Sequence, residues 1–329
     1  MRLMYRAKLW LSIAGLVTLA GIVCFAVFGL KPGIDFTGGS LLEIKYNEAG
    51  RPAAAEIRQL AESTGIGSVS VQLVDEAGAQ LRFKEASEEQ HQALLQALNS
   101  SAAGEGGSNS NASGVKVETE GGGDIGLVEV GTAADENIEE LRFETIGPSI
   151  GQELKTKAVY AIIVCLIVII AYITWSFRHV SKPVASWKYG VASIIALFHD
   201  IMVVVGVFAI LGHYWGIEID SSFIAALLTV LGYSINDTIV VLDRVRENLP
   251  RSNEDFEGTV NTSINQTLAR SVNTTLTTVL ALIALLLFGG DTVRYFMLAL
   301  TIGIASGAYS SIFIAAPILV IWEKWQRRN

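Results

Sequence analysis

Six long apolar runs constrain the fold of this chain more than any other feature of its sequence. They cover approximately residues 9–30, 158–175, 189–211, 222–242, 271–289 and 295–322. A helix needs about 20 apolar residues to cross the roughly 30 Å hydrocarbon core of a bilayer. Because 51% of the 329 residues are hydrophobic and only 17% are charged, the sequence predicts a polytopic α-helical membrane protein with six transmembrane helices.

The first apolar run follows Arg2, Arg6 and Lys8, as the core of a signal peptide would. However, the run is longer than the about 7–15 apolar residues of a signal core, and no small-x-small cleavage motif ends it. We therefore expect residues 1–30 to contain a retained first helix. A five-helix transmembrane bundle is expected over residues 158–322.

Basic residues predict the orientation, because Lys and Arg accumulate on the cytoplasmic side of a membrane. They flank alternate ends of the apolar runs: Arg2, Arg6, Lys8, Arg178, Lys182, Lys188, Arg244, Arg246, Arg251, Lys324, Arg327 and Arg328. The connections at 212–221 and 289–294 contain a single basic residue, Arg294. We therefore expect both termini, including the tail 323–329, to be cytoplasmic and the domain 31–157 to be extracytoplasmic.

The expected extracytoplasmic domain is acidic. Residues 31–150 contain eight Lys or Arg and twenty Asp or Glu, which is a net charge of −12. This charge argues against nucleic acid as a partner. The simplest interpretation is a solvated acidic surface, and the alternative is a charge-specific binding site.

The hydrophobic periodicity of this domain predicts a β-α-β-β-α-β order. Strands are expected at 40–46, 68–74, 79–84, 115–120 and 140–147, and helices at 52–64 and 87–100, with a flexible Gly/Ser-rich insert at 100–114. Ser87 is placed to cap the second helix. The order is typical of a split βαβ, ferredoxin-like α+β domain, a fold that by itself names no function.

Within the membrane, Asn236 and Asp237 interrupt the fourth apolar run. A carboxylate in a bilayer costs several kcal/mol, so it usually has a function or a partner. At the start of the fifth run, a polar stripe at helical spacing ends in a cation: Arg270, Asn273, Thr274, Thr277 and Thr278. Arg270 is therefore the candidate partner of Asp237. The pair would either couple ion movement or act as a static salt bridge between two helices.

A second polar feature, His199–Asp200, lies near the middle of the third run. It would serve either as a secondary proton relay or as a structural hydrogen-bonded pair, and the residues slightly favour the structural role. The sixth run contains a face of small residues that predicts a packing seam, and Pro317 predicts a kink beyond it. The face consists of Gly303, Ser306, Gly307, Ser310 and Ser311. No metal-ligand spacing or nucleotide-binding loop is present in the sequence, so we expect no cofactor and an energy source other than ATP.

Several stretches together resemble the SecD/SecF family of bacterial protein-export membrane proteins, in particular its smaller partner. They are "GIDFTGGS" (33–40), "FETIGPSIG" (143–151), "LFHD" (197–200), "LLTVLGYSINDTIVVLDRVREN" (227–248) and "RSVNTTLTT" (270–278). They occur in order over nearly the whole chain, although the Gly/Ser-rich insert has no counterpart. The glycines and acid of the first stretch, Gly33, Asp35, Gly38 and Gly39, are expected to form a hinge between membrane and outer domain.

This resemblance implies a function in protein export. A member of this family pairs with SecD into a twelve-span unit similar to the RND superfamily and acts on the trans side of the SecYEG channel. It uses the proton gradient, or sodium in some relatives, to promote late steps of the export of unfolded preproteins across the cytoplasmic (inner) membrane. YajC and YidC are further candidate partners.

The resemblance also assigns roles to residues. It places Asp237 and Arg270 in the ion pathway, with Asn236, Asn273 and Thr274 beside them. It implies a transport component rather than an enzyme. Two alternatives remain open on the sequence alone: a proton-driven RND-type exporter of small molecules or lipids, and an assembly subunit that does not couple to ions.

Overall fold

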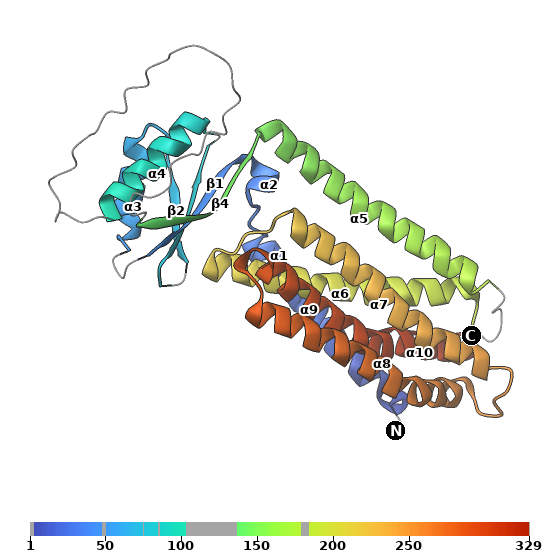
Figure 1. Cartoon of the computed structure of the whole chain (residues 1–329). Helices are drawn as coiled ribbons and strands as arrows, with labels where there is room; N and C mark the ends of the chain where they lie inside the picture. The colour runs from blue at the N-terminus through green and yellow to red at the C-terminus, as the bar shows by residue number, and fades with distance from the viewer. Residues whose placement is uncertain are drawn as a thin grey trace, which may run out of the picture. The chain divides into compact units, whose positions relative to one another are not determined.

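The computed structural model describes residues 3–47, 51–74, 76–84, 86–102, 137–178 and 184–328. The chain divides into two compact units (Figure 1). One unit consists of Met1–Phe36 and Glu153–Asn329, and the other of Thr37–Gln152. The predicted strand 115–120 and residues 103–114 of the predicted insert lie outside the described residues.

The larger unit contains the membrane helices. They are α1 (Ala7–Phe28), α5 (Pro148–Ser176), α6 (Ser186–Trp215), α7 (Ser221–Asn248), α8 (Phe256–Phe288), α9 (Asp291–Ser310) and α10 (Ala316–Arg328). The last two are joined by a π-helical turn, Ser311–Ala315, into one long apolar helix. By length and composition, six helical segments of the described chain are able to cross a membrane, which confirms the predicted six transmembrane helices.

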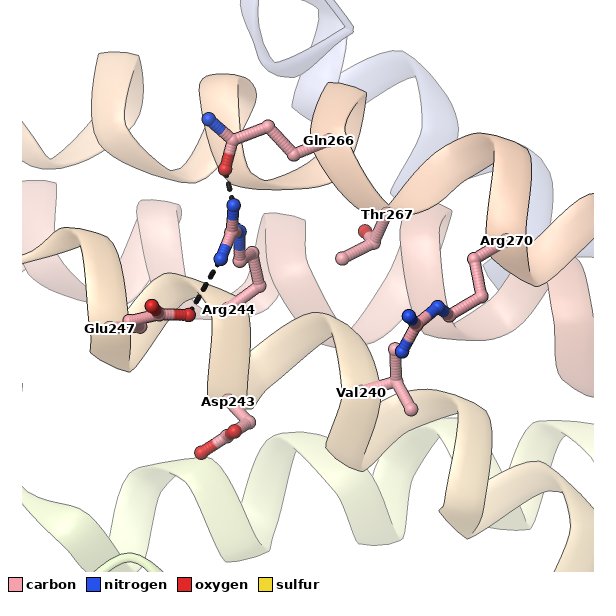
Figure 2. A pocket seen from close by; sticks show the side chains of 7 residues that line it. All are labelled: Val240, Asp243, Arg244, Glu247, Gln266, Thr267 and Arg270. Carbon is pink, nitrogen blue, oxygen red and sulfur yellow. Dashed lines mark hydrogen bonds and ion pairs between the residues drawn. The ribbon is translucent and has the colours of Figure 1, made fainter.

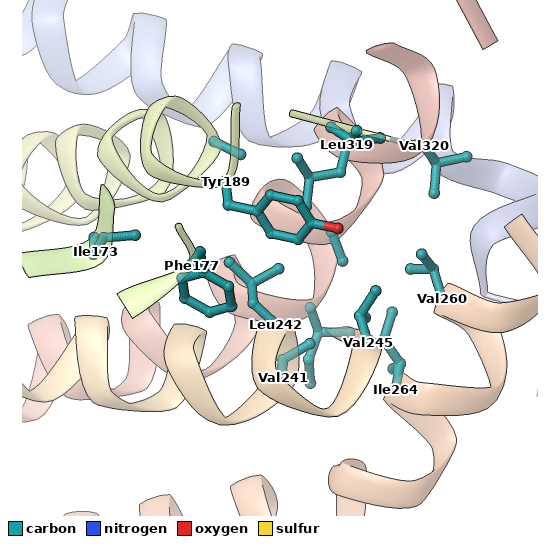
Figure 3. Close-up of a cluster of buried hydrophobic side chains, with 14 of the residues drawn as sticks. Ile173, Phe177, Tyr189, Val241, Leu242, Val245, Val260, Ile264, Leu319 and Val320 are labelled. Atoms are coloured by element: carbon teal, nitrogen blue, oxygen red, sulfur yellow. The ribbon is translucent and has the colours of Figure 1, made fainter. Parts of the chain in front are cut away.

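Helices α6 and α7 and the last span, α9 with α10, form the centre of this unit. In the most apolar 18-residue stretch of each helix, 50% is buried in α6 and in α7 and 67% in the last span, whereas 6% is buried in α5 and 11% in the first span. Figure 3 shows part of the shared core, where Phe177, Tyr189, Leu242 and Leu319 meet from four different segments. The apolar side chains of α1 and α5 are largely exposed and so are available to lipid or to another membrane protein.

Glycines allow two of the helix crossings. A Cβ atom at Gly206 of α6 would lie 2.6 Å from Cα of Gly21 on α1, and one at Gly307 of α9 would lie 2.8 Å from Cβ of Ser234 on α7. Both distances are too short for a side chain, so the helices approach to near backbone contact. The packing seam predicted for the sixth run is therefore present along α9.

The smaller unit is a four-stranded antiparallel sheet with two long helices. Its elements are β1 (Gly39–Tyr46), α3 (Ala54–Ser63), β2 (Ser70–Val74), β3 (Gly78–Phe83), α4 (Glu88–Ala102) and β4 (Ile138–Ile146). The strand order β2-β3-β1-β4 is that of the predicted split βαβ domain. Its core is formed by Leu42, Ile44, Leu81, Ile57 and Leu94.

Local signals in this unit behave largely as expected. Ser87 Oγ accepts a hydrogen bond from the Gln90 amide, and Gln90 Oε1 accepts one from the Ser87 amide, so the two form a capping box before α4. The helix predicted at 52–64 begins at Ala54, so Pro52 precedes it instead of lying in its first turn.

Candidate functional site

Asp237 is a buried carboxylate in the C-terminal half of α7. Its side chain is 5% exposed. Oδ1 accepts a 2.5 Å hydrogen bond from the hydroxyl of Ser271 on α8, and the hydroxyl of Ser311 approaches the same carboxylate. Oδ2 has no hydrogen-bond partner among the described residues. A carboxylate oxygen that is buried and unpartnered is costly in free energy, because no hydrogen bond replaces its lost hydration.

Arg270, the expected partner, does not contact Asp237 in this structure. The arginine is exposed and lines an open cavity of about 320 Å³ between α7 and α8, together with Val240, Asp243, Arg244, Glu247, Gln266 and Thr267 (Figure 2). Consecutive helical residues point about 100° apart. Since Ser271 faces Asp237, its neighbour Arg270 necessarily points elsewhere, and the expected ion pair is replaced by a serine hydrogen bond.

The other predicted residues of this stripe border the same helices. Asn236 and Asn273 are exposed. The Thr274 hydroxyl donates to the Arg270 carbonyl at 2.9 Å, and the Thr274 carbonyl accepts from the Tyr233 hydroxyl of α7 at 3.2 Å. Polar groups exposed within apolar helices are unfavourable next to lipid, so this face suits contact with another membrane helix or with water.

Asp200 of α6 lies in a second, fully buried polar cluster. Its side chain has 0% exposure. Oδ1 accepts from the Ser306 hydroxyl at 2.6 Å, and Oδ2 accepts from the hydroxyls of Ser234 at 2.6 Å and Ser310 at 2.7 Å. His199 Nδ1 lies 3.2 Å from Oδ1, and its Nε2 bonds to the Tyr309 hydroxyl. The cluster joins α6, α7 and α9.

Sequence reasoning missed the serines that contact both carboxylates. Ser306 and Ser310 were expected to serve a packing seam, and Ser271 was not singled out. The signal was weak, because a serine in an apolar helix donates either to a carbonyl of its own helix, as Ser311 does to Gly307, or to a buried acceptor on a neighbouring helix. The two acidic residues in neighbouring runs were the available acceptors of the second kind. The described residues contain no group of three side chains able to hold a metal ion.

The "GIDFTGGS" stretch attaches to the start of α7. The Gly33 amide donates to the Ile219 carbonyl and the Ile219 amide donates to the Lys31 carbonyl, both at 2.8 Å. Asp35 Oδ2 accepts from the Ser221 amide at 2.7 Å. Gly38 and Gly39 have φ angles of 74° and 125°. The first half of the stretch is thus fixed to a helix end, and the second half takes conformations that favour glycine.

Together these features define a polytopic membrane protein with a small α+β domain and an incompletely paired intramembrane carboxylate. Residues 127–325 match the model of the family described as "Protein export membrane protein SecD/SecF, C-terminal", and residues 25–49 match "SecD/SecF GG Motif". The chain belongs to the SecD/SecF family.

Full-length relatives and a solved structure agree with this assignment. The chain is 40% identical to the protein translocase subunit SecF of Thermobaculum terrenum over 94% of this chain and 89% of that protein. It is 38% identical to that of Synechocystis over 90% and 84%. The crystal structure of SecDF from Thermus thermophilus superposes with a TM-score of 0.76 and 32% identity, over 98% of this chain and 38% of that one. The chain therefore spans well under half of that SecDF chain.

Proposed function

We propose that the chain is an auxiliary subunit of the Sec protein translocase that promotes late steps of preprotein export, using the proton or sodium gradient. Relatives of similar length are named protein translocase subunit SecF. The SecDF relative, of which this chain spans 38%, supports SecD as the partner that completes the unit. SecYEG is the proposed channel, with YajC and YidC as further partners and the unfolded preprotein as the client.

The single observation that carries the coupling role is the incomplete pairing of Asp237. One oxygen is bonded to Ser271 and the other has no partner among the described residues. Protonation of that oxygen removes the charge at little geometric cost, and loss of the proton leaves a carboxylate that needs a cation. Arg270 directly precedes Ser271 on the neighbouring helix, so a rotation of α8 by about one residue exchanges Ser271 for Arg270.

The attachment of the "GIDFTGGS" stretch to α7 would transmit this change in α7 and α8 to the outer domain. Because Asp35 bonds to the first residue of α7, a displacement of α7 is carried to the residues just before Gly38 and Gly39. In this proposal both termini are cytoplasmic and residues 31–157 lie on the opposite side of the cell membrane. The outer domain then moves during the cycle and hinders backsliding of the emerging preprotein.

An export assay in inverted vesicles, with and without a proton gradient, tests the proposal. Asp237→Asn keeps the size of the side chain but cannot be ionised, so gradient-dependent export should be lost while the subunit still assembles with SecD. Asp243→Asn is the matched control, since Asp243 lies on the same helix and pairs with Arg246 near the membrane edge. Full gradient-dependent export by Asp237→Asn would instead support the assembly-subunit alternative.

A further inference from the structure

The two buried carboxylates differ in how completely they are hydrogen-bonded. An ionised carboxylate offers about four acceptor positions on its two oxygens. Asp200 has a contact for each: Ser306 and His199 at Oδ1, and Ser234 and Ser310 at Oδ2. Asp237 has an oxygen without a partner among the described residues. Asp200 is therefore saturated and suited to holding its neighbours in place, and Asp237 is the group with room for an exchange.

Two of the serines held by Asp200 are sequence neighbours of the groups around Asp237. Ser234 precedes Asp237 by three residues on α7, and its carbonyl accepts from the Thr238 hydroxyl at 3.1 Å. Ser310 directly precedes Ser311, whose hydroxyl is 2.9 Å from that of Thr238 and approaches Asp237. Asp200 thus holds one serine of α7 and one serine of the sixth span, and both lie near Asp237.

The π-helical turn starts where two consecutive serines, Ser310 and Ser311, face two different acids. It begins at Ser311, directly after the residue that bonds to Asp200. Pro317 lies two residues beyond its end, and a proline cannot donate to the carbonyl four residues earlier, which here belongs to Phe313. Such a widened turn is common beside a helix interruption and at functional sites.

We propose that Asp200 is a positioning residue for Asp237. By binding Ser234 and Ser310, it aligns α7 with the π-helical turn and so keeps the Ser311 hydroxyl beside the Asp237 carboxylate. The proposal rests on the proposed ion-coupling function. The titratable groups that face Asp200 are His199 and Tyr309, whereas Arg270, which adjoins Ser271 on α8, points away from Asp237.

The test uses the full complex with SecD in detergent or vesicles and dicyclohexylcarbodiimide, which modifies protonated carboxyl groups in apolar surroundings. Mass spectrometry of the adducts at a fixed neutral pH gives the modification rate of each acid. In the chain without substitutions, we expect the reagent to modify Asp237 and to leave Asp200 unmodified. A hydroxyl beside a carboxylate favours its ionised form, so displacement of the Ser311 hydroxyl in Ser310→Ala should raise the modification rate of Asp237 about fivefold.

Three further variants complete this test. Ser311→Ala should raise the rate similarly, because it removes the positioned hydroxyl without touching Asp200, and Ser310→Thr should restore the original rate. Ser306→Ala is the matched control, since Ser306 also donates to Asp200 but does not adjoin Ser311; its effect should stay below about twofold. If Ser310→Ala does not fold, Ser311→Ala and Asp200→Asn provide the same comparison.

The outcomes separate the two proposals. Unchanged rates in Ser310→Ala and Ser311→Ala, or equal increases in Ser310→Ala and Ser306→Ala, would overturn the positioning role and leave the coupling role of Asp237 intact. Reaction of the reagent with Asp200 in the chain without substitutions would also overturn the positioning role. If Asp237 is never modified and Asp237→Asn exports with full gradient dependence, the proposed function itself is wrong.

Discussion

Asp35 caps the N-terminus of α7 through a 2.7 Å hydrogen bond from the Ser221 amide. Asp220, the residue before the helix, accepts a second bond at the same end, from the Phe223 amide at 2.9 Å. Two carboxylates therefore satisfy amides that the first turn of a helix leaves unpaired, at the end where the helix dipole favours negative charge. The helix that carries Asp237 thus begins at a fixed point, and part of its cap comes from Asp35 in the short helix α2 (Ile34–Thr37), which follows the first span.

Replacement of Asp35 should weaken this cap in two separable ways. Asp35→Ala removes both the acceptor and the charge, and the loss of a helix cap typically costs about 1 kcal/mol. Asp35→Asn keeps an acceptor and loses the charge, so its effect should be roughly half as large. Thermal unfolding of the purified chain measures both. If the two variants have equal Tm values below that of the unmodified sequence, the hydrogen bond contributes little.

Gly206→Ala should disrupt the crossing of α1 and α6. The new Cβ would lie 2.6 Å from Cα of Gly21, and backbone atoms on both sides cannot move aside easily. We expect a loss of about 2 kcal/mol or more in the free energy of unfolding, together with increased protease cleavage between α1 and the outer domain.

Gly15→Ala is the matched control for this crossing. Gly15 also lies on α1, and a Cβ there would meet no atom within 4 Å among the described residues. Alanine has the higher helix propensity, so Gly15→Ala should be neutral or stabilising by about 0.5–1 kcal/mol. Similar losses in Gly15→Ala and Gly206→Ala would contradict the close approach of the two helices.

Much of this architecture was predictable because it depends on pattern and length. Span lengths follow from bilayer thickness, and strand alternation with two amphipathic helices predicted the split βαβ domain. The partner of Asp237 was not predictable, since a choice between Arg270 and Ser271 depends on the rotation of α8 about its axis. That rotation is set by packing along the whole of α7 and α8, whereas sequence spacing determines only which residues share a face.

The serines that donate to Asp200 were also not predictable from the sequence. In sequence, Ser306 and Ser310 are indistinguishable from residues chosen for close packing, and Gly307 between them does pack closely against Ser234. Both requirements are met by one helix face, because a serine is small enough for the approach and still donates a hydrogen bond. The π-helical turn was likewise anticipated only as a kink at Pro317.

The Gly38–Gly39 turn should tolerate no side chain at its first position. Gly38 has a φ of 74°, and a Cβ there would lie 2.7 Å from Cα of Pro148. Gly38→Ala therefore combines an unfavourable backbone conformation, about 1 kcal/mol, with a clash that costs about 1–3 kcal/mol more. Gly65→Ala isolates the first contribution, because Gly65 has a φ of 81° and a Cβ added there would meet no described atom within 4 Å. In denaturant unfolding, Gly38→Ala should therefore lose more free energy of unfolding than Gly65→Ala. Equal losses in the two variants would rule out the clash.

Tyr46 should make the outer domain sensitive to alkaline pH. Burial raises the pKa of Tyr46 from 10.0 to about 12, against a smaller opposing effect of Arg51. A folded-state pKa above the unfolded value contributes stability that is fully present below pH 10 and is lost as the pH rises toward 12. The unfolding midpoint of the full chain in denaturant, followed at a probe in the outer domain between about pH 8 and pH 12, should therefore fall over this interval.

Tyr46→Phe removes the titrating group and separates this cause from general alkaline denaturation. The Tyr46 hydroxyl is buried without a hydrogen-bond partner among the described residues, so its removal should leave stability at neutral pH unchanged or increase it by up to about 1 kcal/mol. The fall in the unfolding midpoint toward about pH 12 should become shallower by the contribution of this one group. An identical alkaline fall in Tyr46→Phe and the unmodified sequence would show that other groups, and not Tyr46, limit the stability of the domain at high pH.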